Sequence, residues 1–506
     1  MLLLPILLFA AAGSCEQNLG PAITALQQRE AAHALEYLQP LRASCAQSSS
    51  YYELLGLASE LAGQKSEAER ALESAVKLDS RSPRLLTELG ATLFQNGKPA
   101  VAARYLDQSL KIDPANSTTI KYAIGAAVAT KDWRRAADLF GPLQLETNSS
   151  LLQSEPVLLV WFAQAMVETG RLEQLDSLLS SQRGSLSPGL LFSLGTIFGQ
   201  HGLYQRAVDT LAQIPVASAD SPVFFNLGLA YSHLRRFEQA RAAYFQTIDK
   251  HPNDVDAYFH VGVDYAASAQ PRFAIPWLYR AHSLAPQRAD ITYALAEQLI
   301  GLQYLNSAKQ LLSDARTRTA AEPVLLVAEG DLKLAESDPT AAASLFELAL
   351  RRKPGLPAAS AGLARAYTES GKPGLARGVL ETALVHDPQD PSINSELGLL
   401  EEKQGNWSAA LNHLTCAWKQ DQANPRTALA LAHVYERMNR PSEGLTVLDA
   451  IAPMAENSLA YHLELARIYS ALDRRSEAKA EQDKVSALQN QSQDALHFDN
   501  PGTYIR

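Results

Sequence analysis

Small residues recur at a fixed spacing along the apolar positions of this chain. From residue 228 onward they form two series with a period of 34 positions, and the second series lies twelve residues behind the first. The first series is Gly228, Gly262, Ala296, Gly330, Ala364, Gly398, Ala432 and Ala466; the second is Ala240, Ala274, Ala308, Ala342, Ala376, Ala410, Gly444 and Ala478. Because helices approach closely only where their contact residues are small, the pattern predicts a pair of packed helices repeated in tandem.

Larger apolar residues repeat in register with the small ones. One unit has Leu227, Tyr231, Tyr244 and Pro252, and the next has Val261, Tyr265, Leu278 and Pro286. These residue types at these offsets resemble the tetratricopeptide repeat, a helix-turn-helix of 34 residues. The resemblance implies an all-α fold, a right-handed superhelical solenoid of tandem helix-turn-helix repeats. Gly371 and Gly405 are expected at tight turns between helices, where glycine adopts a left-handed conformation at low cost.

The repeat covers nearly the whole chain, in about fourteen hairpins. We expect an N-terminal repeat block at 18–140 and a regular array at 188–489. Between them, 141–187 contains two polar loops and one degenerate hairpin with Gly170 at its turn. Residues 490–506 show no periodicity and are expected to form a tail. Since a repeat array buries its core between neighbouring repeats, a chain of this length can form one continuous body.

The first residues indicate export. Residues 1–14 are an apolar run that ends in small residues, which is typical of a signal peptide and too short to span a bilayer. The following Cys15 leaves three alternatives open: a lipidated first residue, a disulfide with Cys45, or two free thiols. A lipid anchor at Cys15 is the only membrane attachment that we expect. Because 12–15 resembles a bacterial lipobox, we expect a bacterial protein.

Composition narrows the classes of function. The formal net charge is -9, which argues against a nucleic-acid partner, because phosphate binding requires a face rich in Lys and Arg. The sequence has no pattern for a zinc site, a phosphate loop or a nucleophile elbow, so we expect neither an enzyme nor a cofactor. His413 and Cys416 share one helix face, but with no further ligand nearby we interpret them as packing residues and not as a metal site.

The resemblance also implies where a partner binds, because the first helices of such repeats line a concave groove. Four successive units place an aromatic residue at a groove position: Phe192, Phe225, Phe259 and Tyr293. These rings would suit an extended apolar peptide or stacked sugar rings, and the alternative is that they fill space between neighbouring helices. Later units place charged residues at or near the groove: Arg365, Arg426, His433 and Arg467.

The hypothesis from the sequence is therefore an exported scaffold of the periplasm or outer cell envelope. We expect it to bind a protein or an extended peptide segment through its concave groove. The alternative is a carbohydrate-binding or polysaccharide-export accessory protein of the cell envelope, in which the aromatic residues stack on a glycan.

Overall fold

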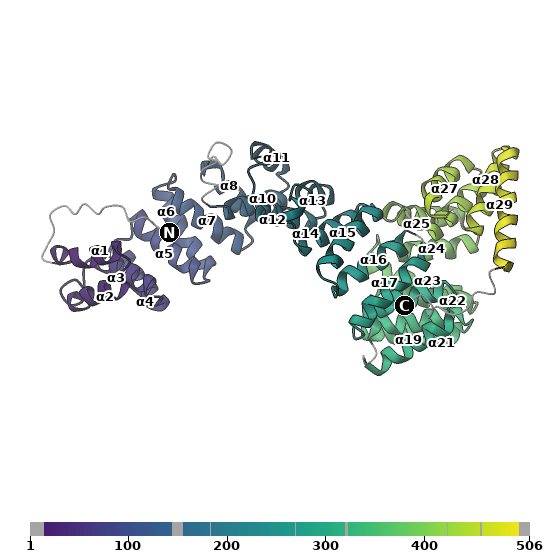
Figure 1. Cartoon of the computed structure of the whole chain (residues 1–506), viewed down its shortest axis with the longest axis horizontal. Coiled ribbons are helices and arrows are strands. Elements are labelled where there is room, and N and C mark those ends of the chain that lie inside the picture. Colours follow the sequence, from purple (N-terminus) through teal and green to yellow (C-terminus); the bar gives the residue numbers. More distant parts are fainter. Residues whose placement is uncertain are drawn as a thin grey trace. The chain divides into compact units, whose positions relative to one another are not determined.

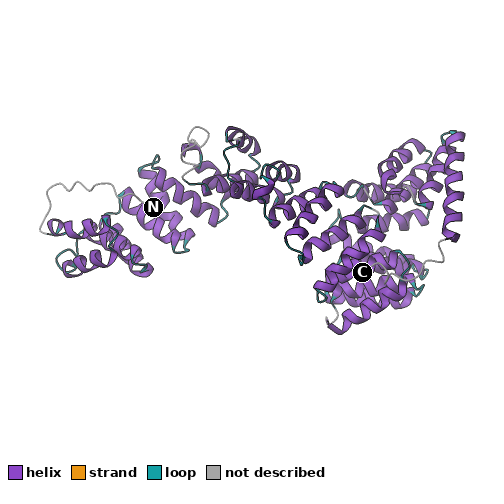
Figure 2. Cartoon of the chain, in the orientation of Figure 1, coloured by secondary structure: helices purple, strands orange, loops and turns teal. Residues whose placement is uncertain are grey.

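The computed structural model describes residues 15–143, 155–182, 184–268, 270–318, 322–422, 424–455 and 458–494. Throughout these residues the regular structure is helical, without a strand (Figure 2). Their 28 α-helices form fourteen hairpins, so the predicted all-α fold of tandem helix-turn-helix repeats is confirmed. The chain divides into two compact units, unit 1 up to Ala219 and unit 2 from Asp220 (Figure 1).

Unit 1 contains six of the described hairpins. Their helices are α1 (Gly20–Gln27), α2 (Ala31–Leu38), α3 (Ser49–Leu61), α4 (Lys65–Leu78), α5 (Pro83–Gln95), α6 (Pro99–Ile112), α7 (Ser117–Ala129), α8 (Trp133–Leu139), α10 (Val157–Thr169), α11 (Leu172–Ser181), α12 (Pro188–Gln200) and α13 (Tyr204–Leu211). We expected the regular array to begin at residue 188, whereas the hairpin α12–α13 belongs to unit 1. The helix α13 is followed by a 3-10 helix, Val216–Ser218, before unit 2 begins.

Unit 2 contains the other eight hairpins. Their helices are α14 (Ser221–His233), α15 (Phe237–Lys250), α16 (Val255–Ala267), α17 (Pro271–Leu284), α18 (Ala289–Gly301), α19 (Leu305–Arg318), α20 (Pro323–Ala335), α21 (Pro339–Arg352), α22 (Pro357–Glu369), α23 (Pro373–His386), α24 (Pro391–Lys403), α25 (Trp407–Gln420), α26 (Pro425–Arg437), α27 (Pro441–Ala455), α28 (Leu459–Ala471) and α29 (Arg475–Asp494). Even-numbered helices are the first helices of these hairpins, and odd-numbered helices are the second.

Polar residues fix the starts of many first helices at the same register. The side chains of Ser82, Asn116, Asp390 and Asn424 each accept a hydrogen bond from the amide three residues further on. Such a cap satisfies an amide that has no partner inside the helix. For these hairpins the sequence therefore specifies where the first helix starts as well as which face it buries.

The turns inside the hairpins share one backbone feature, a residue with positive φ. Gly371 and Gly405 have φ of 71° and 74°, as predicted. Other hairpins place a residue with a side chain at the equivalent position: Lys131, Arg235, Gln303, Ser337, Asn439 and Asp473. Because left-handed backbone is unfavourable for such residues, the packing of the two helices must impose the turn where glycine is missing.

The first series of small residues makes room for a side chain sixteen positions later. A Cβ atom on Gly228 would lie 2.4 Å from Cε1 of Tyr244, and one on Gly262 would lie 2.5 Å from Cγ of Leu278. Phe346 fits in the same way between the glycines of two adjacent first helices, Gly330 and Gly362. The period predicted from the sequence thus reflects a socket for a large residue as well as two facing small positions.

First helices also pack on the first helices of neighbouring hairpins. In unit 2 these contacts run in series from α14 through α16, α18, α20, α22, α24 and α26 to α28. Unit 2 curves back on itself (Figure 1). Arg235, in the turn between α14 and α15, therefore comes close to Asp421, which follows α25, with 3.4 Å between Nη1 and Oδ1. The first helices therefore form a continuous inner surface in this unit.

The irregular region contains the expected degenerate hairpin, whereas the C-terminal end differs from expectation. The degenerate hairpin at 141–187 is present as α10 and α11, with Gly170 at φ 71°, while 144–154 lie outside the described residues. The tail was expected from residue 490, but α29 continues to Asp494, and 495–506 lie outside the described residues. This helix buries Ala478, Glu481 and Val485, so it has an inner face.

A disulfide joins Cys15 to Cys45, with their Cα atoms 5.3 Å apart. The structure therefore has one of the three alternatives expected for Cys15. Cys45 is buried beside Leu19 and Leu38, so the bond ties the start of the described chain to the first hairpin. The predicted signal segment, 1–14, lies outside the described residues. In the described part of the chain, none of the helices combines the length and apolar character that crossing a membrane requires.

Candidate functional site

Five successive first helices of unit 2, α18 to α26, line a cavity of about 560 Å³. Its polar and charged lining includes Tyr293, Glu297, Asp331, Arg365, Glu396 and Arg426. Apolar lining comes from Ile300, Leu334, Ala358 and Ala361. The volume is within the range of ligand-binding pockets, and the mixture of side chains can contact apolar and charged groups together.

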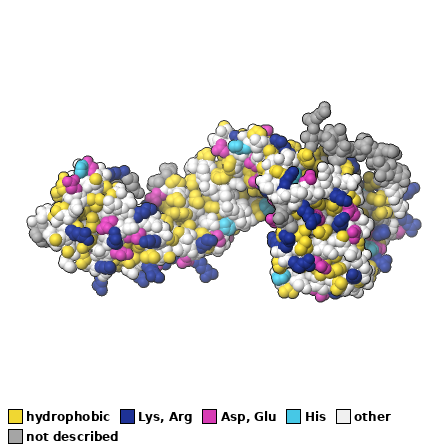
Figure 3. Space-filling view, turned by 90° about the horizontal axis from the view of Figure 1, so that it is seen from below, with side chains coloured by type: hydrophobic (Ala, Val, Ile, Leu, Met, Phe, Trp, Pro, Cys, Tyr) yellow, Lys and Arg dark blue, Asp and Glu magenta, His cyan; other side chains and the backbone are white. Residues whose placement is uncertain are grey.

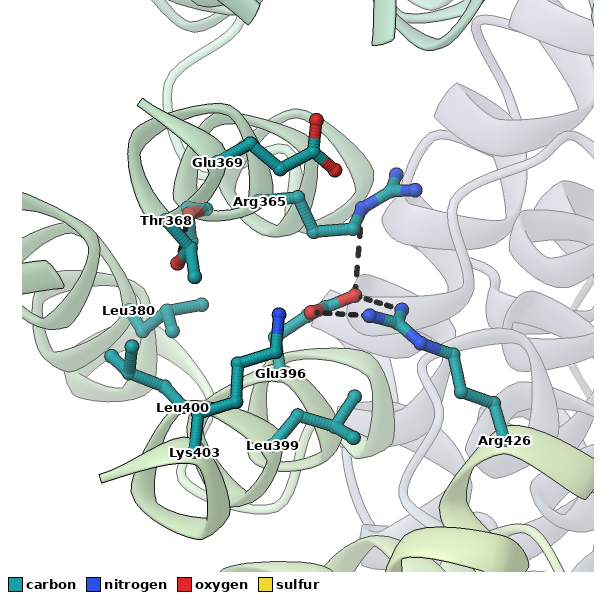
Figure 4. Close-up of a pocket in the computed structure, with 10 residues that line it drawn as sticks. Arg365, Thr368, Glu369, Leu380, Glu396, Leu399, Leu400, Lys403 and Arg426 are labelled. Atoms are coloured by element: carbon teal, nitrogen blue, oxygen red, sulfur yellow. Dashed lines mark hydrogen bonds and ion pairs between the residues drawn. The ribbon is translucent and has the colours of Figure 1, made fainter. Parts of the chain in front are cut away.

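Two arginines and two carboxylates form a network across this cavity. Arg365 on α22 donates from Nη2 to Oδ1 of Asp331 on α20 at 2.7 Å, and its Nε lies 3.5 Å from Oε1 of Glu396 on α24. Arg426 on α26 binds both oxygens of Glu396, with 3.1 Å between Nη2 and Oε2. Figure 4 shows the two arginines converging on this glutamate. The network links four adjacent hairpins through their first helices.

Enclosure by the cavity shifts the titration of its acidic groups. Burial raises the pKa of Glu297, Asp331 raises it further, and Arg365 partly opposes both. The Glu297 side chain is accessible to water, but the protein around it still limits its solvation. Burial raises the pKa of Asp331 as well, and Glu396 adds to this effect, so the attraction of Arg365 is outweighed.

For Arg365 itself the balance is different. Burial alone would lower its pKa, but Asp331 and Glu396 outweigh burial and raise it. The guanidinium group therefore stays charged, and its two neighbours hold it in place.

A smaller cavity of about 50 Å³ adjoins the first on the α22–α24 side. It shares Arg365 and Glu396 with the larger cavity and adds Leu380 and Lys403 (Figure 4). On the face of the molecule shown in Figure 3, acidic and basic side chains are intermingled, and no continuous basic surface is visible there.

Comparison with protein families decides what kind of repeat this is. Three family models, each described as tetratricopeptide repeat, match the chain: one at residues 333–395 and 402–463, one at 62–117 and one at 223–254. These segments carry tetratricopeptide repeats. The matched segments fall on hairpins of both units, and the longest matches include the first helices α22 and α26 and only the two ends of α24.

Comparison with other proteins adds two solved structures. One is a structure of Naa15/Naa10 bound to HypK-THB, with 16% identity, a TM-score of 0.37, and coverage of 95% of this chain and 76% of that chain. The other is the APC/C hetero-tetramer Cut9-Hcn1, with 16% identity, a TM-score of 0.39, and coverage of 89% and 95%. No curated protein matches the chain.

The cavity between α18 and α26 brings together three of the eight residues predicted for the groove. Tyr293, Arg365 and Arg426 line one cavity. The other two charged candidates do not line it. His433 on α26 pairs with Glu402, with 2.5 Å between Nδ1 and Oε1, and Arg467 on α28 pairs with Glu464 at 3.1 Å.

The other predicted aromatic residues make contacts of their own. The Phe225 ring lies 5.7 Å from the Tyr244 ring and 5.5 Å from His260. Phe259 lies 5.3 Å from the same histidine, and the Arg288 guanidinium lies over it at 5.6 Å. These contacts agree with the packing alternative for both rings. Phe192 is half-buried on α12 of unit 1, so the four aromatic residues are divided between the two units.

Sequence analysis missed the four carboxylates of the cavity, Glu297, Asp331, Glu369 and Glu396. A signal for two of them was available, because Glu297 and Asp331 precede Arg365 at intervals of 34 residues. Glu297, Asp331 and Arg365 each directly follow a residue of the first small series. The register therefore places them on one surface, but the pairing of Arg365 with Asp331 depends on side-chain conformation.

A second buried charge cluster lies in unit 1. Arg84 on α5 is paired with Glu53 on α3, and its Nε lies 3.6 Å from Oε1 of Glu88. Burial raises the pKa of Glu88 to about 7, Arg84 opposes this shift, and Glu60 adds to it. Thr92 donates to Glu60 at 3.0 Å. The cluster links the first helices of two hairpins, as the network of unit 2 does.

The two residues weighed as metal ligands are engaged with other side chains. His413 Nδ1 lies 3.1 Å from Oδ1 of Asn394, and Cys416 donates from Sγ to Oε1 of Gln389 at 3.4 Å. Among the described residues, no group of three or more His, Cys, Asp and Glu side chains is placed to hold a metal ion.

Proposed function

We propose that this protein is an exported scaffold that binds an extended segment of a partner protein in the cavity between α18 and α26. The tetratricopeptide repeats support a role in protein–protein interaction. The observation that carries the proposal is the cavity itself, whose walls come from the first helices of five successive hairpins. Such a surface presents side chains at regular intervals, which suits a chain lying across the helices.

The cavity chemistry supports a protein segment as the occupant. Tyr293, Ile300 and Leu334 can contact apolar side chains, while the charged network can contact polar groups. The arginines are held by their carboxylate partners, so little side-chain freedom is lost when a segment binds. A carbohydrate partner is less well supported, because the rings of Phe225 and Phe259 contact neighbouring side chains.

Export is proposed on two observations. The apolar run at 1–14 has the composition of a signal peptide, and Cys15 is paired with Cys45. Disulfides persist in oxidising compartments such as the bacterial periplasm. Cell fractionation and N-terminal sequencing of the mature chain test the proposal; recovery of an uncleaved chain in the cytosol would contradict it.

A bulky residue placed in the cavity tests the binding function. Ser392 is exposed, lines the cavity and follows Pro391 in the first turn of α24. Ser442 is exposed and follows Pro441 in the first turn of α27, outside the residues that line the cavity. These two positions therefore offer a matched pair of Ser→Trp variants.

We expect Ser392→Trp to lose partner capture from the envelope fraction, quantified by mass spectrometry, and Ser442→Trp to retain it. Equal capture by both variants, with both folded by circular dichroism, would contradict the proposed site. A clear signal on a glycan array that Ser392→Trp abolishes would favour the carbohydrate alternative.

A further inference from the structure

The charges that line the large cavity do not balance. Four of the lining residues are acidic, Glu297, Asp331, Glu369 and Glu396, and two are arginines. Both arginines are already paired, Arg365 with Asp331 and Glu396, and Arg426 with Glu396. Among the ion pairs of the described residues, Glu297 has no cationic partner. The cavity therefore has a net negative charge, and its α18–α20 end has a carboxylate available for a ligand.

The surroundings of this carboxylate favour a long side chain with a terminal positive charge. Tyr293 lies one helical turn before Glu297 on α18, and Ile300 lies close to one turn after it. Leu334 on α20 lines the same cavity. Lysine and arginine have apolar stems that pack on such residues, and an aromatic ring attracts their charged ends. A divalent metal ion would require more ligands than this end provides.

We propose that the α18–α20 end of the cavity binds a lysine or arginine side chain of the partner segment, with Glu297 as its carboxylate partner. The inference rests on the proposed function and specifies the chemistry of the partner. Asp331 contributes negative charge beside the bound cation and keeps its bond to Arg365. The opposite end presents Arg426, whose side chain is more than half exposed, so the site distinguishes the two ends of a bound segment by charge.

Peptide selection against the whole protein tests the proposal without a known partner. A displayed library of random twelve-residue peptides is selected on the purified chain, and the strongest binder is made with a fluorescent label. We expect the selected peptides to be enriched in lysine or arginine over the starting library. We expect replacement of the essential basic residue by glutamine to weaken binding at least tenfold.

Protein variants then locate the contact. Glu297→Gln removes the charge without breaking an ion pair of the described residues, and it should weaken binding of the selected peptide at least tenfold. Glu381→Gln is the matched control, because Glu381 is exposed on α23 and does not line the cavity. Glu297→Lys should reject the basic peptide and should recover binding when glutamate replaces the basic residue of the peptide.

The outcomes separate this inference from the proposed function. If Ser392→Trp abolishes binding but the peptides are neutral or acidic, or Glu297→Gln binds within twofold of the original protein, the cavity binds peptides and the basic-residue inference is wrong. If the library yields no binder, or Ser392→Trp leaves binding unchanged, the proposed function itself is contradicted.

Discussion

The socket at Gly228 allows a quantitative test of how the repeat packs. In Gly228→Ala the new methyl carbon would lie 2.4 Å from Cε1 of Tyr244, and this ring is fully buried between α14 and α16. Overpacking of this kind costs about 1–3 kcal/mol. Alanine also gains about 1 kcal/mol over glycine in a helix interior. We therefore expect a net loss of up to about 2 kcal/mol of local stability.

A matched glycine gives the opposite expectation. Gly378 lies inside α23 with an exposed backbone, and a Cβ atom there would meet nothing within 4 Å. Gly378→Ala should therefore stabilise its hairpin by about 0.5–1 kcal/mol, the helix-propensity gain alone. The two substitutions make the same chemical change and differ only in the socket.

Other repeats of this chain suggest a rescue. Where alanine replaces glycine in the first series, as at Ala296 and Ala364, the residue sixteen positions later is a buried leucine, Leu312 or Leu380. We expect Gly228→Ala combined with Tyr244→Leu to be more stable than the sum of the single changes allows, by about 1 kcal/mol.

Hydrogen exchange measured by mass spectrometry on α14 and α15 is the appropriate assay, because repeat arrays need not unfold in one step. If Gly228→Ala protects these amides as much as Gly378→Ala protects those of α23, or the double variant shows no coupling, the socket argument is wrong.

Three further predictions follow from single features of the fold. Burial raises the pKa of Asp264 to about 7 despite a hydrogen bond from Ser232, so the folded state holds a proton that the unfolded state releases near pH 4. Stability is therefore lost as the pH rises from 4 to 7. In denaturant titrations, Asp264→Asn should be more stable than the original protein at pH 8, by on the order of 2–4 kcal/mol, and should lose this advantage at pH 4. Replacing Cys15 and Cys45 by serine should reduce exchange protection in α1 and α2 by about 3–4 kcal/mol, an effect that reductant reproduces in the original protein and not in the variant. Ser337 has φ of 61°, so Ser337→Gly should slow hydrogen exchange in α20 and α21, which corresponds to a gain of up to about 1 kcal/mol in the free energy of opening. Faster exchange would show that the turn is unstrained.

The hairpins could be predicted from the sequence because local interactions specify them. Small residues at 228 and 262 mark the sockets, Asn424 begins a helix, and Gly371 forms a turn, each within one repeat. The start of unit 2 was harder to predict, because the repeats continue on both sides of it and no repeat is missing there.

The candidate site was predicted only in part. Register placed Tyr293 and Arg365 on the inner surface, and the structure brings both to one cavity. The contacts of Phe225 with His260 could not be read from the period, because a residue on a first helix can face either the groove or the neighbouring helix. Pairing of Arg426 with Glu396 joins different hairpins, so it depends on the spacing and rotation of whole repeats.

Photo-crosslinking of the selected peptide to the protein tests the central claim most directly. A benzoylphenylalanine is placed at Ala358, which is half-buried in the cavity, or at Val385, which is 79% exposed on α23 and does not line it. We predict an adduct at position 358 that unlabelled peptide suppresses, and none at position 385. An adduct at 385, or equal adducts at both positions, would contradict binding between α18 and α26.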